Sequence, residues 1–444
     1  MFKSFQRLFL IVLIFLLALG NGTVQPARSE TDLVFNVDST ADNNDYAINS
    51  VCSVGAITGG PCTLRAAIAE ANWNGVHGNI TINIPAGTYD LTIPPVSMND
   101  ITSGDLDFPT ANPNHTIRLI GTGAQPAVID ANQLDRVFDI GLDVKVEMEN
   151  IVIKGGLLSW TGITDFHDGA GILNMGTLTL TRVVVEENEA RCGQATCDFY
   201  ISGGGILNVG TMVIVNSTIR NNKSVGSSAI AHSGSGMMFI TNSSIYGNQA
   251  TEAFVIDNYA KLHIRNSTIS GNTASPIYIA GIRNNHTLIL ESSTIANPGR
   301  ISSIYNTATG TVTIHDSILK NTPGAGGGGN CQNSGTWISE GYNIFSDDSC
   351  PASGAGDDVD TDPMLGPLGY WGGTTMTMPL QTGSPAKDNR PGNCTKIPES
   401  AVLPPNEVLT EDQRHYPRSD GNCDTGAFEG VMDIRTVFLP IIFR

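Results

Sequence analysis

Apolar residues recur at fixed positions along the chain between Val144 and Asn321. Aligning seven units on one apolar anchor gives spacings of 34, 34, 26, 24, 26 and 24 residues between successive anchors. The anchors are Ile151, Val185, Ile219, Ile245, Ile269, Ile295 and Leu319. Two more apolar columns lie five and seven residues upstream of every anchor and begin with Val146 and Val144. An apolar pair two residues apart has the period of a β-strand, because alternate side chains point to the same face.

Polar residues mark two bends in each unit. The first bend lies between the paired strand positions and the anchor, at Asn216, Asn242, Asn266, Ser292 and Asp316, each followed by serine. The second follows the anchors, at Asn188, Asn222, Asn248, Asn272, Asn297 and Asn321. These residue types bend a chain through hydrogen bonds of their own side chains. Each unit is therefore expected to run strand, turn, strand, turn, without a helix.

Units of about two dozen residues with such short strands cannot bury their own apolar face, so they must stack on copies of themselves. The pattern predicts an all-β chain with residues 80–322 forming a right-handed parallel β-helix, whose coils rise about 4.8 Å each. A leucine-rich-repeat horseshoe is the competing solenoid. It requires a denser leucine pattern and often a helix in every repeat.

The N-terminus has the pattern of an exported protein. A basic start is followed by an apolar run from Leu8 to Leu19, which predicts a secretory signal peptide over residues 1–29, cleaved after Gly20 or Ser29. No later segment is long enough to span a membrane. We therefore expect a secreted or cell-surface protein with no transmembrane span in the mature chain.

The charge argues against nucleic acid as a partner. The formal net charge is −18, and charged residues make up only 15% of the chain. A chain of this charge without a basic patch is repelled by a phosphate backbone.

The eight cysteines of an exported chain indicate disulfides. Their spacing favours four local pairs: Cys52 with Cys62, Cys192 with Cys197, Cys331 with Cys350, and Cys394 with Cys423. Sequence alone leaves the other pairings open. Zinc is the alternative, but the cysteine and histidine spacings do not support it.

An acidic turn follows the first expected strand. Asp38, Asp42 and Asp45 are three carboxylates within eight residues and are candidate calcium ligands, because calcium prefers hard oxygen ligands. The alternative is an acidic turn that is simply solvated. Calcium is the only cofactor that the sequence suggests.

One helix is expected near the N-terminus. Thr63 can cap it, and Leu64, Ala67, Ile68 and Ala71 share one face, as in an amphipathic lid over the first coil. The string Cys62-Thr-Leu-Arg-Ala-Ala67 resembles the CSLREA module of exported bacterial proteins and departs from it at the second and fifth places. The resemblance covers residues 30–79 and implies export and a β-helix behind the motif, with no established reaction.

The two 34-residue units place their extra length at the same point of consecutive coils, over 155–169 and 189–204. Stacked loops of this kind would wall a groove, which gathers candidate catalytic residues Asp165, His167, Asp168 and Glu187, together with Glu186, Asp198 and Tyr200. The alternative is that these loop carboxylates are solvated. The Asn-Thr-Asp, Gly-His-Gly and Arg-Ile-Lys strings of polygalacturonases are missing.

After Asn321 the repeat ends and a loop-rich segment begins. Residues 323–430 include Asp360-Thr-Asp-Pro-Met-Leu-Gly-Pro-Leu368 and Cys423-Asp-Thr-Gly-Ala-Phe-Glu429. This order is similar to the choice-of-anchor Q domain of exported bacterial β-helix proteins. Asp388, Asp412, Arg414, Asp424 and Glu429 are expected to hold turns in place. Residues 431–444 form a short apolar tail that is either an attachment signal or a last strand.

Two functions remain open. The first is a non-enzymatic adhesive or structural role in which the rigid solenoid binds a polysaccharide or cell-surface glycan. The second is a polysaccharide lyase or glycoside hydrolase that acts in the groove. The missing catalytic motifs favour the first.

Overall fold

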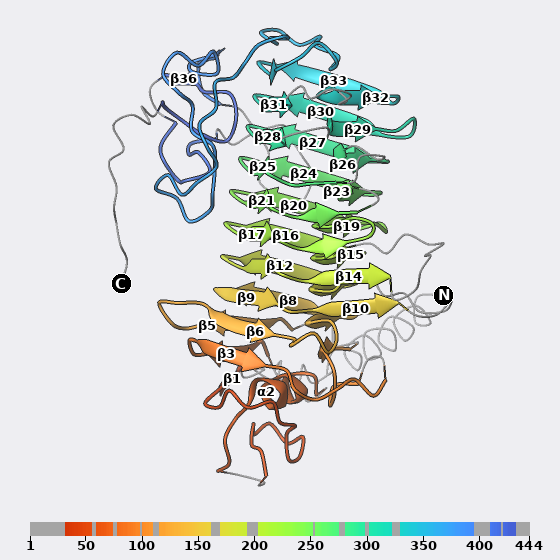
Figure 1. Cartoon of the computed structure of the whole chain (residues 1–444). Coiled ribbons are helices and arrows are strands. Elements are labelled where there is room, and N and C mark those ends of the chain that lie inside the picture. Colours follow the sequence, from red (N-terminus) through yellow and green to blue (C-terminus); the bar gives the residue numbers. More distant parts are fainter. Residues whose placement is uncertain are drawn as a thin grey trace, which may run out of the picture.

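The computed structural model describes residues 32–55, 59–73, 78–97, 100–109, 115–160, 169–192, 203–251, 254–274, 280–297, 302–321, 329–394, 409–418 and 421–431. The chain winds through successive coils that stack along one axis, from the helix α2 at one end to β33 at the other (Figure 1). Three long parallel sheets of eleven, ten and nine strands follow this axis, with a fourth of four strands. The prediction of an all-β parallel β-helix is confirmed.

The eleven-stranded sheet contains the apolar pairs that the repeat pattern identified. Its strands, in spatial order, are β1 (Leu33–Asn36), β2 (Ile80–Ile84), β5 (Ile117–Gly121), β8 (Lys145–Glu149), β12 (Thr177–Thr181), β16 (Thr211–Val215), β20 (Met237–Thr241), β24 (Lys261–Arg265), β27 (Thr287–Glu291), β30 (Thr311–His315) and β33 (Thr336–Gly341). Leu178, Met212, Met238, Leu262 and Leu288 form one column that is completely buried. This column faces the interior of the tube.

The ten-stranded sheet carries the anchor column. Its strands are β3 (Gly87–Asp90), β6 (Ala127–Asp130), β9 (Ile151–Lys154), β13 (Val184–Glu186), β17 (Thr218–Arg220), β21 (Ser244–Tyr246), β25 (Thr268–Ser270), β28 (Thr294–Asn297), β31 (Ile318–Asn321) and β34 (Ile344–Phe345). Ile219, Ile245 and Ile269 are direct neighbours in the parallel register and are buried. The predicted column of anchors is therefore present.

The remaining sheets close the coil. The nine-stranded sheet contains β4 (Leu106–Phe108), β7 (Phe138–Ile140), β11 (Ile172–Asn174), β15 (Ile206–Asn208), β19 (Ile230–His232), β23 (Phe254–Asn258), β26 (Ala280–Asn284), β29 (Ser302–Asn306) and β32 (Cys331–Asn333). The four-stranded sheet contains β10 (Leu157–Trp160), β14 (Glu189–Cys192), β18 (Lys223–Ser224) and β22 (Gln249–Ala250). The long coils that were expected to stack do so through β10 and β14, which pair in parallel.

The register of the first repeat differs from the alignment by two residues. Val185 pairs with Ile153 rather than with Ile151, and Leu178 pairs with Val146 rather than with Val144. A shift of two keeps the same side chains inside, because the side-chain period of a strand is two, so the apolar pattern cannot distinguish the two registers. Asn150, with φ of 55°, lies three positions before Ile153, as Asn216 does before Ile219, in agreement with the observed register.

Polar side chains at the bends form ladders from coil to coil. In one, each asparagine donates its amide Nδ2 to the Oδ1 of the next, and the donor–acceptor distances are 2.9–3.3 Å. It comprises Asn188, Asn222, Asn248, Asn272 and Asn297, which are buried. In a serine ladder, the backbone N–H of Ser217 donates to the Ser243 hydroxyl, and Ser243 repeats the contact with Ser267. The ladders satisfy backbone groups that the bends would otherwise leave unpaired.

An N-terminal cap covers the first coils. It contains α2 (Leu64–Ala71), whose N-cap hydroxyl on Thr63 accepts from the backbone N–H of Ala66 at 3.2 Å. Every residue of α2 is buried, and the helix packs against β2 and β4. Arg65 pairs with Asp42 at 2.6 Å and donates to the backbone carbonyls at Gly104 and Asp105. The helix is therefore a lid, as the sequence predicted.

The loop-rich C-terminal segment packs against the outer face of the ten-stranded sheet (Figure 1). Phe428 and Leu380 belong to a second, smaller apolar core that also contains Ile318 of β31. The segment also contains β35 (Arg390–Pro391) and β36 (Asn422–Cys423), which pair antiparallel. Arg414 forms a buried ion pair with Asp412 at 2.5 Å, so these residues hold turns of the loop segment together.

The disulfides Cys52–Cys62, Cys331–Cys350 and Cys394–Cys423 are present, which confirms three of the four predicted pairs. Cys197 lies outside the described residues, so its pairing with Cys192 stays a prediction. The signal peptide over 1–29 also lies outside them. Among the described residues, no helix has the length and apolar character that crossing a membrane requires.

Candidate functional site

A cleft of about 530 Å³ runs across four successive coils, at the corner where the ten-stranded sheet meets the four-stranded sheet. The residues that line it come from equivalent positions of those coils: Glu187, Asn188, Glu189, Asn221, Lys223, Gly247, Gln249, Gly271 and Thr273. Each coil contributes a turn residue and, two positions later, an exposed or partly exposed residue that follows the asparagine ladder. The cleft therefore runs parallel to the axis of the solenoid.

The repeated bend creates this corner. Glu187, Asn221, Gly247 and Gly271 occupy the same turn position, and all four have a left-handed backbone with φ between 54° and 67°. The buried asparagine ladder follows immediately and holds the bend on its inner side. Along the coils the turn side chain shrinks from glutamate to glycine. A Cβ added at Gly271 would meet no atom within 4 Å, so the cleft is open at that end.

The charges of the cleft are locally balanced. Glu187 accepts a hydrogen bond from Lys154 at 2.8 Å, and this bond lowers the pKa of the Glu187 carboxyl and raises the pKa of Lys154. Glu189 lies beside Lys223 in the parallel register of β14 and β18. The exposed lining is completed by the amide of Gln249 and the hydroxyl of Thr273. These groups can donate and accept several hydrogen bonds at once.

The structure describes two of the predicted groove residues, Glu186 and Glu187, and places them at different sites. Glu187 lines the cleft, and its predicted catalytic role stays a prediction. Glu186 lies on the neighbouring outer face of the ten-stranded sheet, where it accepts a hydrogen bond from Arg220 at 2.6 Å. The other candidates lie outside the described residues, and their roles stay predictions: Asp165, His167, Asp168, Asp198 and Tyr200.

The three predicted calcium ligands are each engaged with protein groups in the cap. Asp42 pairs with Arg65 and accepts from the backbone N–H groups of Thr92 and Ile93. Asp38 accepts from the backbone N–H of Cys62 at 2.7 Å, and Asp45 accepts from that of Ser53 at 2.8 Å. They stabilise the fold of the cap, and the carboxylates that the structure brings together in one cluster are different ones.

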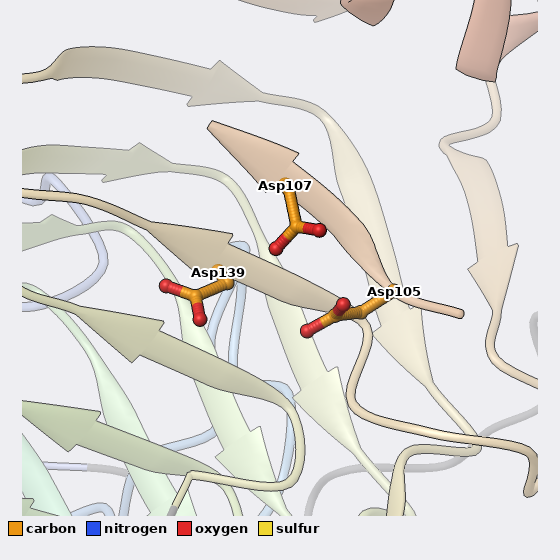
Figure 2. Close-up of side chains that lie close together, drawn as sticks. All are labelled: Asp105, Asp107 and Asp139. Atoms are coloured by element: carbon orange, nitrogen blue, oxygen red, sulfur yellow. The ribbon is translucent and has the colours of Figure 1, made fainter. Parts of the chain in front are cut away.

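That cluster consists of Asp105, Asp107 and Asp139, all buried, with one oxygen of each within 4.8 Å of the others. Asp107 and Asp139 are direct neighbours in the register of β4 and β7, and Asp105 lies just before β4. Figure 2 shows Asp105 and Asp107 extending toward the strand that carries Asp139. The cluster lies close to α2, because the Nδ2 of Asn72 at the end of the helix donates to the carbonyl of Asp107 at 2.7 Å.

Sequence reasoning missed most of this site. Lys223, Gln249 and Thr273 follow the predicted asparagine column by one residue, so the repeat alignment contained the signal that they face the same corner. Asp107 and Asp139 are polar residues between apolar neighbours in short strands. The sequence shows that both aspartates alternate with apolar residues. It does not show that they become neighbours, because the aligned repeat begins at Val144, after both of them.

Comparison with known proteins supports the fold. No family model matches the chain, and no curated protein sequence matches it. A crystal structure of the pectate lyase Pel9A is similar to this chain, with 15% sequence identity and a TM-score of 0.50. The similarity covers 91% of this chain and 97% of that one. At this identity the likeness is one of fold, and the chain is an all-β protein built on a parallel β-helix.

Proposed function

We propose that this protein is exported and binds a polysaccharide chain along the cleft, without chemical conversion of that chain. One observation carries the proposal: equivalent side chains from four coils line a single cleft that follows the solenoid axis. Coils rise by about 4.8 Å, so the lining repeats at short, regular intervals. A polymer of repeating units is the class of ligand that matches a repeating lining.

The lining favours a neutral polysaccharide over an acidic one. Lys154 is paired with Glu187, and Lys223 lies beside Glu189, so the described lining offers a polyanion no surplus of positive charge. The formal charge of −18 adds long-range repulsion of an acidic polymer. Hydroxyl groups of a neutral sugar can instead pair with the carboxylates, the Gln249 amide and the Thr273 hydroxyl.

A blocking variant tests this use of the cleft. Gly271→Asn places a side chain in the open end, and the turn accepts it, because Asn221 has the same left-handed conformation at the equivalent position. In affinity gel electrophoresis with neutral and acidic polysaccharides, we expect retardation by a neutral one. The variant should bind roughly tenfold more weakly, equivalent to about 1.4 kcal/mol.

Gly392→Asn is the matched control. Gly392 also has a positive φ, of 84°, and free space around its missing Cβ, but it lies in the C-terminal segment. It should bind like the unmodified protein. Binding to no polysaccharide, or equal binding by Gly271→Asn, contradicts the proposal.

A hydrolase or lyase is the second candidate function, because two carboxylates, Glu187 and Glu189, share the cleft. The lowered pKa of Glu187 keeps it ionised at neutral pH, which suits a base or nucleophile and not the general acid that glycoside hydrolysis also requires. Incubation with the same polysaccharides distinguishes the two functions. New reducing ends or unsaturated products that disappear in Glu187→Gln would establish an enzyme.

We also propose that the ends of the chain are export and attachment modules. The lid over the first coils supports a CSLREA-like module over residues 30–79, and the Asp–Arg pairs of the loop segment support a choice-of-anchor Q-like region over 323–430. Together with the disulfides, they suit a secreted or cell-surface location. Fractionation of the native host would test this, and recovery of the protein from the cytoplasm alone would contradict it.

A further inference from the structure

The cluster of Asp105, Asp107 and Asp139 contains buried oxygen atoms without partners. Asp107 is only 2% exposed, and neither of its carboxylate oxygens has a hydrogen-bond partner among the described residues. Oδ1 of Asp139 is also buried and has no hydrogen-bond partner among the described residues. Burying a carboxylate without a compensating partner is costly, so such groups in native proteins bind an ion or take up a proton.

Among the described residues, basic side chains do not balance the charges of the three aspartates. Nη1 of Arg136 donates to Oδ2 of Asp105 and to Oδ2 of Asp139, at 3.0 Å each. The other nearby guanidinium, on Arg65, is already paired with Asp42. Three carboxylates therefore share one guanidinium, and a divalent cation would supply the charge that balances them.

A proton is the competing solution. Burial, with the neighbouring aspartates Asp105 and Asp139, raises the pKa of Asp107 to about 8. Protonation would remove the excess charge, but the carboxylic acid would then need an acceptor for its O–H, and neither oxygen has a partner. A cation satisfies the charge and the unpartnered oxygens together.

A fourth oxygen without a partner lies close by. It is Oδ1 of Asn72, which is buried and belongs to the same amide whose Nδ2 donates to the carbonyl of Asp107. Asn72 is the C-cap of α2, so the end of the helix carries a neutral oxygen on the same amide group that bonds the backbone of Asp107. An all-oxygen set of carboxylates and an amide is typical of a calcium site.

We propose that Asp105, Asp107 and Asp139 bind a calcium ion, which fastens the N-terminal lid to the first coils of the solenoid. Calcium fits better than magnesium, because calcium accepts several carboxylate and amide oxygens in a flexible geometry, whereas magnesium requires near-ideal octahedral geometry and usually keeps several waters. The carboxylate oxygens here lie within 4.8 Å of one another, so they can reach one ion without a rearrangement of the strands. The site is independent of the cleft and of any ligand bound there.

The test uses the full exported chain after treatment with a chelator. Calorimetric titration with calcium chloride should show saturable binding, with weaker binding of magnesium chloride, and calcium should raise the melting temperature by several degrees. Asp107→Asn should weaken calcium binding by roughly tenfold or more and abolish the rise in melting temperature. In chelator the same variant should be at least as stable as the unmodified protein, because the amide removes a buried charge.

Asp143→Asn is the matched control. It removes the same charge from the turn after β7, at an exposed position whose φ of 62° asparagine tolerates, and should leave calcium binding unchanged. Hydrogen exchange provides a readout of position, because calcium should slow exchange in α2 and β4. If Asp107→Asn fails to fold, the same measurements are made on Asp139→Asn, with the same expected results. The proposal is overturned if the unmodified protein does not bind calcium, or if either aspartate variant binds calcium as tightly as the unmodified protein does.

Discussion

At the scale of single residues, buried polar groups outside the tube core are paired with one another, as Glu291 shows. Glu291 in β27 is fully buried and accepts hydrogen bonds from His263 at 2.7 Å and from Arg265 at 2.5 Å. Burial by itself raises the pKa of this carboxyl, but the bonds and charges of His263 and Arg265 outweigh it and lower the pKa to about 2. The ionised carboxylate is therefore strongly favoured in the folded protein.

This pKa predicts the direction of acid sensitivity. The folded pKa of Glu291 is below its ordinary value of 4.5, so its contribution to stability is present above pH 4.5 and is lost as the pH falls through about 2. The pKa difference corresponds to about 3 kcal/mol. Glu291→Gln should flatten the fall in unfolding free energy over this range, as measured by urea unfolding at several pH values, and should destabilise the protein at pH 7 by roughly 3–5 kcal/mol.

The matched control is Glu147→Gln. Glu147 forms an exposed ion pair with Arg118 on the same sheet, so its loss should cost less than about 1 kcal/mol. Equal effects of the two substitutions would contradict the role assigned to the buried pair.

At the scale of elements, the side-chain ladders fix the stacking of the coils. Asn248 is completely buried, accepts from the backbone N–H of Asn222, and donates to the carbonyl of Ile219 at 3.0 Å and to Oδ1 of Asn272 at 2.9 Å. Asn248 thus forms hydrogen bonds with the coil before it and with the coil after it. This continuity explains why asparagine recurs at the second bend of the sequence repeat.

Replacing one member of this ladder should be costly. Asn248→Ala leaves several buried donors and acceptors unpaired, and each costs about 1–3 kcal/mol. We expect a loss of at least about 2 kcal/mol in the unfolding free energy, measured by chemical denaturation. Gln249→Ala changes the next residue, which is exposed, and should alter stability by less than about 0.5 kcal/mol. A ladder variant as stable as this control would show that the asparagine column is dispensable.

At the scale of the whole molecule, the C-terminal segment packs on the outside of the solenoid through a small apolar core that is distinct from the core of the tube. Phe428 is 1% exposed and lies in the smaller apolar core, with the Arg414 guanidinium 3.3 Å from its ring centroid. Coils of a solenoid depend mainly on their neighbours, so damage to this segment need not spread along the stack.

Phe428→Ala should therefore loosen the segment locally. Removing a buried phenylalanine costs roughly 3–5 kcal/mol. Limited proteolysis followed by mass spectrometry should show new cleavage within 360–431, while the solenoid stays intact. Val359→Ala, at a position that is 41% exposed, is the control and should leave the cleavage pattern unchanged. Simultaneous cleavage of the coils and the segment would contradict this separation.

The sequence by itself determined the parallel β-helix, the column of anchors, both bends, the lid helix and three local disulfides. Each depends on neighbours along the chain or on a period that repeats from coil to coil. The tertiary structure alone decided the register of the first repeat, because a shift of two residues keeps the same face inside. It also decided which carboxylates meet: Asp107 and Asp139 are 32 positions apart and become neighbours only when β4 and β7 pair. The cleft likewise required the coils to stack before Glu187 and Thr273 could line one surface.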